Sequence, residues 1–231
     1  MLSFCDKGHI MIITIDGPAA AGKGTLATYL SKKYHLSYFD TGMVYRAVGI
    51  EMLDKKEDIN NEQAAEQIAK NLTFLKMLEL STHPEFRGPQ GGKNASIVSS
   101  YPSVRQALLK MQRDFAQNPV LTDGSRASGV VYDGRDTGTV VCPNADIKLY
   151  ITASSEVRAE RRYKEFQAKG IKISYEDVLS DVKARDDRDS KRSASPLKPA
   201  PDAIIIDTSY LNIQEVIEKV CKIIDSQVKK S

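Results

Sequence analysis

The stretch GPAAAGKGT, from Gly17 to Thr25, decides the fold of this 231-residue chain. It follows a short apolar run, Ile10–Ile15, whose β-branched residues are typical of a buried parallel strand. A helix is predicted directly after it, from Gly22 to Lys33. A glycine-rich turn between strand and helix lets backbone N–H groups point inward, beside the positive end of the helix. The stretch therefore predicts a phosphate-binding loop, and a glycine-rich turn without a ligand is the less favoured interpretation.

The residue after the lysine departs from the usual pattern of such loops. Ser or Thr normally stands there and ligates Mg²⁺, whereas this chain has Gly24 and places a hydroxyl one residue later, at Thr25. Lys23 supplies a mobile positive charge for the β- and γ-phosphates of ATP. We expect no direct protein ligand to the Mg²⁺ that arrives with ATP, and expect Thr25 and Asp133 to act on it through water. Asp133 ends an apolar run, as a magnesium-orienting carboxylate would, or caps the next turn. The ATP-binding residues predicted in the loop are Gly17, Pro18, Ala19, Ala20, Ala21, Gly22, Lys23, Gly24 and Thr25.

Composition and charge narrow the class of protein. The net charge is only +3, from 33 basic and 30 acidic residues, whereas a general nucleic-acid binder carries a stronger basic excess. No apolar run approaches the roughly 20 residues of a membrane span, and the N-terminus lacks the pattern of a signal peptide. The 3 cysteines are widely spaced, which predicts reduced thiols rather than disulfides or a zinc site. We expect a cytoplasmic monomer that binds neither nucleic acid nor membrane, with residues 1–9 as a flexible extension.

Downstream of the loop, short apolar runs alternate with helical patterns. Further strands or apolar runs are predicted at Leu36–Phe39, Val130–Asp133, Ile147–Ile151 and Ala203–Asp207. Helices are predicted at Gly42–Leu53, Glu62–Lys70, Asn94–Ser100, Pro102–Asn118, Ser155–Lys169 and Ser174–Lys191, and from Asn212 onward. Ser174 is the predicted N-cap of its helix, and Asn212 and Glu215 have the spacing of a capping box. The stretch Thr73–Lys93 carries proline and glycine signals typical of a loop. The alternation predicts an α/β fold, with a parallel sheet of about five strands and helices on both faces.

Four further segments accompany the loop. They are DTGMVYR at Asp40–Arg46, NAS and PSVR within Asn94–Arg105, YDGRDTGTVV at Tyr132–Val141, and RDDRDSKRSASPL at Arg185–Leu197. With the loop, this set closely resembles the bacterial-type cytidylate kinase family of nucleoside monophosphate kinases, from about Ile12 to Ile224. The resemblance implies a P-loop kinase fold with a core over residues 10–60 and 129–231. A monophosphate-binding lobe would span residues 61–128, and a short lid would lie near residues 158–172.

The resemblance implies transfer of the γ-phosphate of Mg²⁺-bound ATP to CMP, and to dCMP. A monophosphate acceptor needs no strong general base, because its second pKa of about 6 leaves it largely ionised at neutral pH. The enzyme must instead hold two anions in line and offset their repulsion, which calls for many arginines. One alternative is the same architecture with AMP, UMP or shikimate as acceptor. A less favoured one is a non-catalytic nucleotide-dependent regulator, although the switch patterns Asp-x-x-Gly and Asn-Lys-x-Asp are absent from the sequence.

The resemblance also assigns an acceptor site. Arg46 and Arg135 would hold the acceptor phosphate. Ser96, Arg105 and Asp136 would read the cytosine edge. The other acceptor-site residues, which would contact the sugar or lie beside the nucleotide, are Thr41, Tyr45, Arg185, Asp189 and Arg192. The residues expected to carry catalysis are Lys23, Asp133, Arg135 and Arg185.

Helix geometry supports one cluster independently of the resemblance. Arg185, Asp189 and Arg192 are four and three residues apart along a predicted helix, so they share one face. Residues 186 and 187 point elsewhere in this arrangement. For residues 186–188, ordinary solvated surface charges are an equally good interpretation.

Two segments fit the family pattern less fully. The lid arginines predicted to contact ATP are Arg158, Arg161 and Arg162, and a plain basic surface helix is the alternative. In the shortened, glycine-rich stretch Leu80–Gly92, Arg87 matches a family arginine, but Gly88 replaces the hydroxyl residue usual after it. How this lobe grips its substrate is therefore open.

Overall fold

Five parallel strands form a single sheet in the order β2-β3-β1-β4-β5. Their bounds are β1 Met11–Asp16, β2 Leu36–Asp40, β3 Gly129–Gly134, β4 Ile147–Thr152 and β5 Ile204–Asp207. The predicted parallel α/β sheet is thus confirmed. The computed structural model describes residues 10–228, so the extension predicted for residues 1–9 lies outside the described part of the chain.

The register of the central strand β1 determines which loops meet at the carboxyl edge of the sheet. Asp16, at the end of β1, pairs with Gly134 of β3, and Asp40 of β2 pairs with Asp133. The segments that follow parallel strands emerge at the same edge, where open α/β sheets bind ligands. The phosphate loop, the segment after β2 and the segment after β3 are therefore neighbours despite their separation in the sequence.

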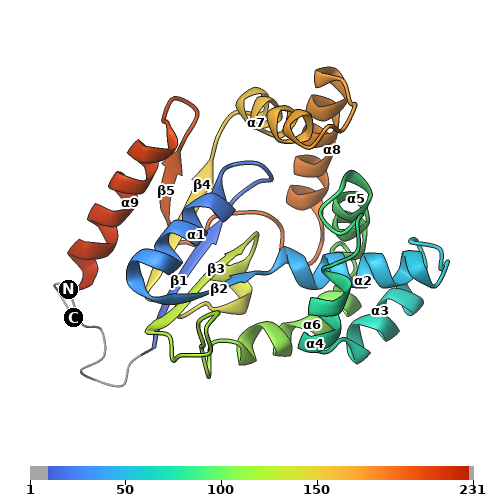
Figure 1. Ribbon diagram of the computed structural model, residues 1–231, viewed down its shortest axis with the longest axis horizontal. Helices are drawn as coiled ribbons and strands as arrows, with labels where there is room; N and C mark the ends of the chain where they lie inside the picture. The colour runs from blue at the N-terminus through green and yellow to red at the C-terminus, as the bar shows by residue number, and fades with distance from the viewer. Residues whose placement is uncertain (1–9, 229–231) are drawn as a thin grey trace.

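Helices cover both faces of the sheet (Figure 1). On one face, α1 (Lys23–Tyr34) and α9 (Ile213–Val228) bury Leu26, Leu30 and Val220 against the strands. On the other face lie α2 (Gly42–Asp54), α6 (Pro102–Asp114) and the π-helical turn η2 (Thr137–Val141). Their apolar side chains surround the fully buried Tyr132 of β3. Burial of this kind stabilises by roughly 25 cal/mol per Å² of apolar surface removed from water.

The loop predicted for Thr73–Lys93 is wrong, because two helices occupy most of it. α4 (Phe74–Leu80) begins where the Thr73 side chain accepts a hydrogen bond from the Lys76 N–H, and it buries Met77. α5 (Pro89–Val98) begins at a proline, which lacks the N–H that a first helical residue leaves unpaired. Its Gly91 allows close packing, since a Cβ there would lie 2.2 Å from the Glu85 carbonyl oxygen. Gly91, which resembles a loop signal, is therefore a packing residue inside a helix.

The helices α2, α3 (Glu62–Asn71), α4, α5 and α6 form one lobe, to the right in Figure 1. One apolar cluster runs from this lobe into β3 without a break. The boundaries drawn from the sequence between core and lobe stay a prediction.

Two helices, α7 (Ser155–Ala168) and α8 (Tyr175–Lys191), stand above the carboxyl edge of the sheet (Figure 1). They share a small core of their own, which includes Phe166 and Val178. Ser174 caps α8 as predicted, accepting a hydrogen bond of 3.0 Å from the Asp177 N–H. The predicted capping box of α9 is also confirmed, since Asn212 and Glu215 exchange side-chain to backbone hydrogen bonds. No helix within residues 10–228 is long and apolar enough to cross a membrane.

Candidate active site

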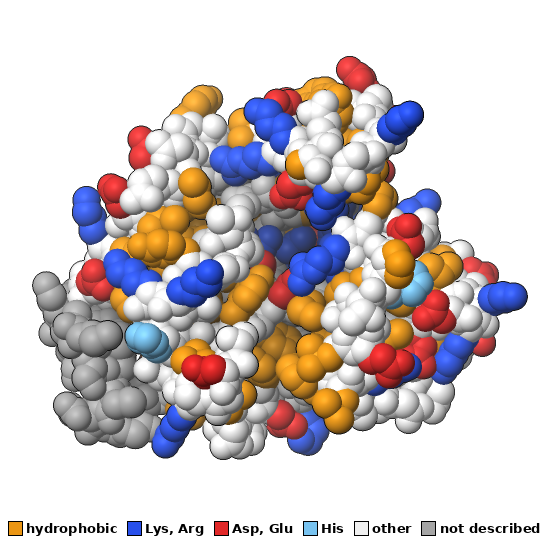
Figure 2. Space-filling model, viewed as in Figure 1, with side chains coloured by type: hydrophobic (Ala, Val, Ile, Leu, Met, Phe, Trp, Pro, Cys, Tyr) orange, Lys and Arg blue, Asp and Glu red, His pale blue; other side chains and the backbone are white. Residues whose placement is uncertain are grey.

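A cleft of about 520 Å³ opens at the carboxyl edge of the sheet, between the phosphate loop, α2, α5 and α8. Lys and Arg side chains gather in and around this hollow (Figure 2). Most of the predicted site residues line it: Ala19, Ala20, Gly22, Lys23, Gly24, Thr25, Thr41, Tyr45, Arg46, Arg105, Asp133, Arg135, Asp136, Arg162, Arg185, Asp189 and Arg192. The others do not line it: Gly17, Pro18, Ala21, Ser96, Arg158 and Arg161.

The phosphate loop needs glycine for two different reasons. Gly17 has a φ of 146°, and a Cβ on it would lie 1.9 Å from the Ile151 carbonyl oxygen of β4, so only glycine fits. Gly22 has a φ of 94° and caps α1 in the left-handed conformation, which glycine adopts without strain. Ala20 also has a positive φ, of 58°. The loop therefore curls tightly ahead of α1, as a cradle of N–H groups requires.

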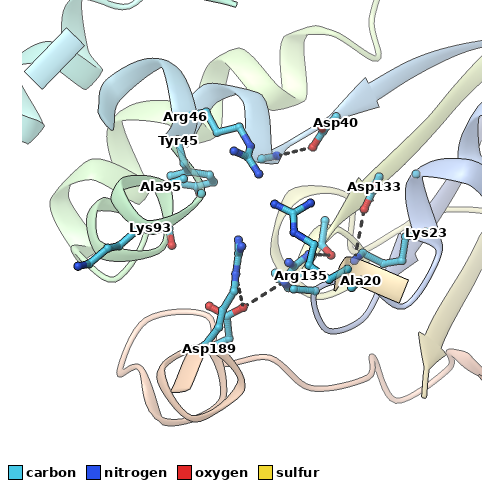
Figure 3. Close-up of a pocket in the computed structure, with 18 of the residues that line it drawn as sticks. Ala20, Lys23, Asp40, Tyr45, Arg46, Lys93, Ala95, Asp133, Arg135 and Asp189 are labelled. Carbon is cyan, nitrogen blue, oxygen red and sulfur yellow. Dashed lines mark hydrogen bonds and ion pairs between the residues drawn. The ribbon is translucent and has the colours of Figure 1, made fainter. Parts of the chain in front are cut away.

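Lys23 and Asp133 face each other at the base of the loop (Figure 3). The Lys23 ammonium lies 3.7 Å from a carboxylate oxygen of Asp133 and donates a 2.9 Å hydrogen bond to the Pro18 carbonyl. Burial lowers the pKa of Lys23 to about 8, and the nearby Arg135 charge acts in the same direction. Burial also raises the pKa of Asp133 to about 6, against the attraction of Lys23. Both groups are charged between these values, which cover neutral pH.

Asp133 does not cap the turn that follows β3. Within residues 10–228, its carboxylate contacts only Lys23 and the Tyr38 hydroxyl, 3.5 Å away. The capping role belongs to Asp16, which accepts hydrogen bonds of 2.8 Å from the Thr137 N–H, the Thr137 hydroxyl and the Gly138 N–H. Of the two interpretations of Asp133, the structure leaves the carboxylate that faces the cleft.

Asp16 is a residue that sequence reasoning missed. It is the last residue of β1 and directly precedes the phosphate loop, while its hydrogen-bond donors directly follow Arg135 and Asp136. Burial raises the pKa of Asp16, although its three hydrogen bonds oppose that shift. One carboxylate thus ties the loop to the arginine-bearing segment after β3. Its position between an apolar strand and the loop was the only signal in the sequence.

The predicted helix face on α8 is confirmed, and it meets the segment after β3. Asp189 accepts a 3.1 Å hydrogen bond from Arg135 Nε, and Arg185 Nε and Arg192 Nη1 each lie 3.9 Å from its carboxylate. Burial raises the pKa of Asp189, but the three arginines outweigh it and hold that pKa below its ordinary value. Burial, helped by the Arg135 charge, lowers the pKa of Arg185 to about 9. This concentration of buried positive charge is costly without an anion nearby.

The facing wall comes from α2 and the segment before it. Arg46 and Arg135 point into the same space from opposite sides (Figure 3). Arg46 donates a 2.8 Å hydrogen bond to the Phe86 carbonyl, and burial lowers its pKa to about 10. Thr41 is fixed beneath them, because its N–H and its hydroxyl each donate a 2.9 Å hydrogen bond to the Asp133 carbonyl.

A second part of the cleft is built around Arg105. Its guanidinium forms a short, buried ion pair with Asp136, donates a 3.0 Å hydrogen bond to the Ser99 carbonyl and lies over the Tyr45 ring. Ser96 is nearby but only 3% exposed, and its hydroxyl accepts a 3.2 Å hydrogen bond from Arg188 Nε. Arg188 lines the cleft at this point and Ser96 does not.

The lid arginines lie in three different environments. Arg158 is buried and paired with Asp186 of α8. Arg161 donates hydrogen bonds of 3.0 Å and 2.8 Å to the Thr208 hydroxyl and carbonyl. Of the three, only Arg162 lines the cleft, where it pairs with Glu165. Residue 186 does point away from the face that carries Arg185 and Asp189, and it pairs there with Arg158 because α7 packs against that side of α8, so it is not a solvated surface charge.

Arg87 lines the cleft from the start of α5 and is mostly exposed, with its guanidinium 3.9 Å from Asp40. Gly88, which stands where a hydroxyl residue is usual, caps α5 without a side-chain hydrogen bond. Cys142 and Cys221 are buried and free, and Cys5 lies outside the described residues. Within residues 10–228, no group of three or more His, Cys, Asp and Glu side chains could hold a metal ion.

Comparisons with known proteins agree with this site. The family model described as cytidylate kinase matches residues 13–226. The chain is 44% identical over 216 residues to a cytidylate kinase of Rhodopseudomonas palustris, covering 94% of this chain and 96% of that protein. It is 42% identical over 215 residues to a cytidylate kinase of a Caulobacter species, covering 93% and 94% of the two chains. A match of this extent includes every segment that lines the cleft, and the chain therefore belongs to the cytidylate kinase family.

Proposed function

We propose that this protein transfers the γ-phosphate of ATP to CMP and dCMP, giving ADP with CDP or dCDP. The observation that carries the proposal is one cleft with two anion-binding walls. The phosphate loop with Lys23 forms one wall, and the cluster of Arg135, Arg185 and Asp189 forms another. A triphosphate on the loop would therefore point toward a monophosphate held by the arginines.

Transfer between two phosphates depends mainly on positioning and on charge. The attacking oxygen is already ionised, and the developing charge lies on oxygens that arginine and lysine can contact. Lys23 would hold the β- and γ-phosphates, while Arg46 and Arg135 would hold the acceptor phosphate from opposite sides. Arg185, buried beside Arg135, would stabilise the phosphoryl group while it is transferred from ATP to the acceptor phosphate. The repulsion among these arginines would be offset by the bound phosphates.

Mg²⁺ would arrive with ATP and neutralise phosphate charge when bound. The residues present fit this role, because Asp133 offers carboxylate oxygen, the ligand type that Mg²⁺ prefers. The absence of a side chain at Gly24 leaves space next to the Asp133 carboxylate, since a Cβ at residue 24 would lie only 3.3 Å from Asp133 Oδ2. A metal that retains its waters would therefore be held by Asp133 and Thr25 through those waters.

The base would bind beside Arg105, Asp136 and Tyr45, the second part of the cleft. The Arg105 guanidinium holds the Asp136 carboxylate in place, where it would accept a hydrogen bond from the amino group of the base. Arg192 would lie beside the nucleotide, and Asp189 would contact its sugar. Arg162 would approach ATP from the lid, whereas Arg158 and Arg161 would act from behind the loop through their bonds to loop carbonyls.

The test is an ADP-release assay with ATP and a panel of acceptors: CMP, dCMP, UMP, AMP and shikimate. We expect turnover with CMP and dCMP well above the others. Turnover with a different acceptor and none with CMP or dCMP would overturn the acceptor assignment. ATP binding without turnover on any acceptor would favour the nucleotide-dependent regulator instead.

A further inference from the structure

The arginines around the base-binding part of the cleft differ in how far the protein already engages them. Arg105 is held at both terminal nitrogens, by Ser99 and Asp136. Arg192 is held by the Ser195 carbonyl at its Nε and lies beside Asp189, whereas its Nη2 is buried without a hydrogen-bond partner among residues 10–228. These guanidiniums are fixed parts of the wall, with little freedom to adapt to a base.

Arg188 has a different arrangement. It extends from α8, is exposed and lines the cleft, and only its Nε is engaged, by the Ser96 hydroxyl of α5 at 3.2 Å. Within residues 10–228, no acceptor receives a hydrogen bond from its two terminal nitrogens. The same contact is the one side-chain hydrogen bond that joins α8 to α5 in the described chain. The hydrogen bond to Ser96 thus orients the Arg188 guanidinium, while its two terminal nitrogens remain available to donate to a ligand.

The chemistry of the base shows what such a group can distinguish. Cytosine presents two acceptors, ring N3 and O2, beside its amino donor, whereas uracil presents an N–H at N3. Arginine carries donors only. Two donors facing each other leave both unpaired, which costs binding free energy because the bound base displaces the water that would otherwise pair with them.

We propose that Arg188, oriented by Ser96, is a further specificity-determining residue of the acceptor site, whose terminal nitrogens donate to N3 and O2 of cytosine. This inference rests on the proposed function. It goes beyond that function because Arg188 takes the place of Ser96 as the group that contacts the base directly. Ser96 acts through Arg188, because Ser96 is buried behind it and the guanidinium is the group that faces the cleft.

The experiment compares CMP and UMP as acceptors for the intact protein and four variants. These are Arg188→Met, Arg188→Lys, Ser96→Ala and the double variant Ser96→Ala/Arg188→Met. Lys191→Met is the matched control, since Lys191 lies on the same helix, is exposed, pairs with Asp187 and does not line the cleft. The KM for ATP reports whether each variant keeps its fold and its phosphate loop.

We expect Arg188→Met to lower the kcat/KM ratio of CMP over UMP about tenfold, the effect of losing a charge-assisted hydrogen bond. The loss will lie in the KM for CMP, with the KM for ATP within about twofold of wild type. Arg188→Lys will lower the ratio as well, because a single compact ammonium lacks the planar fork by which a guanidinium bonds Ser96 with one nitrogen and the base with the other two. Lys191→Met will leave the ratio unchanged.

The double variant separates this inference from direct reading by Ser96. If Ser96 acts only through Arg188, adding Ser96→Ala to Arg188→Met changes the ratio no further. Independent, additive losses would overturn the inference, and so would an unchanged CMP over UMP ratio in Arg188→Met. Wild-type turnover of CMP tests the proposed function separately, since it can succeed whether or not Arg188 matters.

Discussion

Arg158 and Asp186 form a two-pronged ion pair that joins α7 to α8 behind the phosphate loop. The Arg158 Nη1 lies 3.0 Å from one carboxylate oxygen and donates a further 3.3 Å hydrogen bond to the Ala19 carbonyl of the loop. Its Nε donates to the Ala153 carbonyl at 2.9 Å. Asp186 directly follows Arg185, which lines the cleft. The pair therefore links the lid, the loop and the acceptor-facing helix.

Asp186→Asn is predicted to destabilise the protein by about 3 kcal/mol, because it leaves a buried guanidinium without its counter-charge. Arg158→Met will cost less, since the freed Asp186 is 29% exposed and can be hydrated. Urea unfolding measures both. The matched control is Asp187→Asn, which removes the exposed ion pair with Lys191 and will change the free energy of unfolding by less than about 1 kcal/mol. Equal effects of Asp186→Asn and Asp187→Asn would contradict the assignment.

Lys23→Ala is predicted to lower kcat by about 10³ or more, the range found for a single cation that stabilises phosphoryl transfer. Its fold will persist, because removing a buried ammonium also removes the desolvation penalty that lowers its pKa. Initial rates with saturating ATP and CMP, together with a urea midpoint, check both parts. A variant that keeps near wild-type kcat would overturn the role of the loop lysine.

The pH dependence of kcat/KM for ATP is predicted to fall above about pH 8. This parameter reports ionisations of the free enzyme. The pKa of Lys23 is about 8, so raising the pH through that value removes the ammonium charge that attracts the triphosphate. In Lys23→Arg, which does not titrate in this range, the alkaline fall will disappear even if the activity is lower. A fall that persists unchanged in this variant would assign it to another group.

Arg185→Ala and Asp189→Ala are predicted to impair use of CMP far more than binding of ATP. Asp189 holds Arg135 and lies beside Arg185 and Arg192, so its loss leaves three arginines without their shared counter-charge. We expect the KM for CMP to rise at least about tenfold, with the KM for ATP within about threefold. Equal losses on the two substrates would argue against placing this cluster in the acceptor site.

Asp16→Asn is predicted to raise the KM for CMP and to lower stability by about 2 kcal/mol. An amide offers one oxygen and turns its NH₂ toward a donor, so at least one of the three hydrogen bonds to Thr137 and Gly138 is lost. The segment that carries Arg135 and Asp136 then loses its anchor to the loop. Thr137→Val is the control, since it removes only the hydroxyl bond and will cost about 1 kcal/mol. A stability loss in Asp16→Asn without any change in the KM for CMP would make Asp16 a purely structural residue.

The sequence predicted the elements whose signals are local. The apolar run before Gly17 and the glycine-rich turn after it define a strand, a loop and a helix within one continuous stretch. The capping residues Ser174 and Asn212 were also recognisable, because a cap forms between residues three apart. The prediction for Thr73–Lys93 is wrong because Gly91 and Gly92 lie inside α5, where Gly91 allows close packing against the carbonyls of Glu85 and Phe86.

By itself, the sequence determined the phosphate loop, the parallel α/β fold and the set of charged residues available for the cleft. Only the tertiary structure decided which charge meets which: Asp16 with Thr137, Asp186 with Arg158, and Arg188 with Ser96. These partners lie on different elements, and their meeting depends on strand register and on how helices pack. Strands and helices leave a repeating pattern of apolar residues in the sequence, because backbone hydrogen bonding fixes which side chains share a face. An ion pair between two distant elements leaves no such repeat, so the sequence does not reveal it.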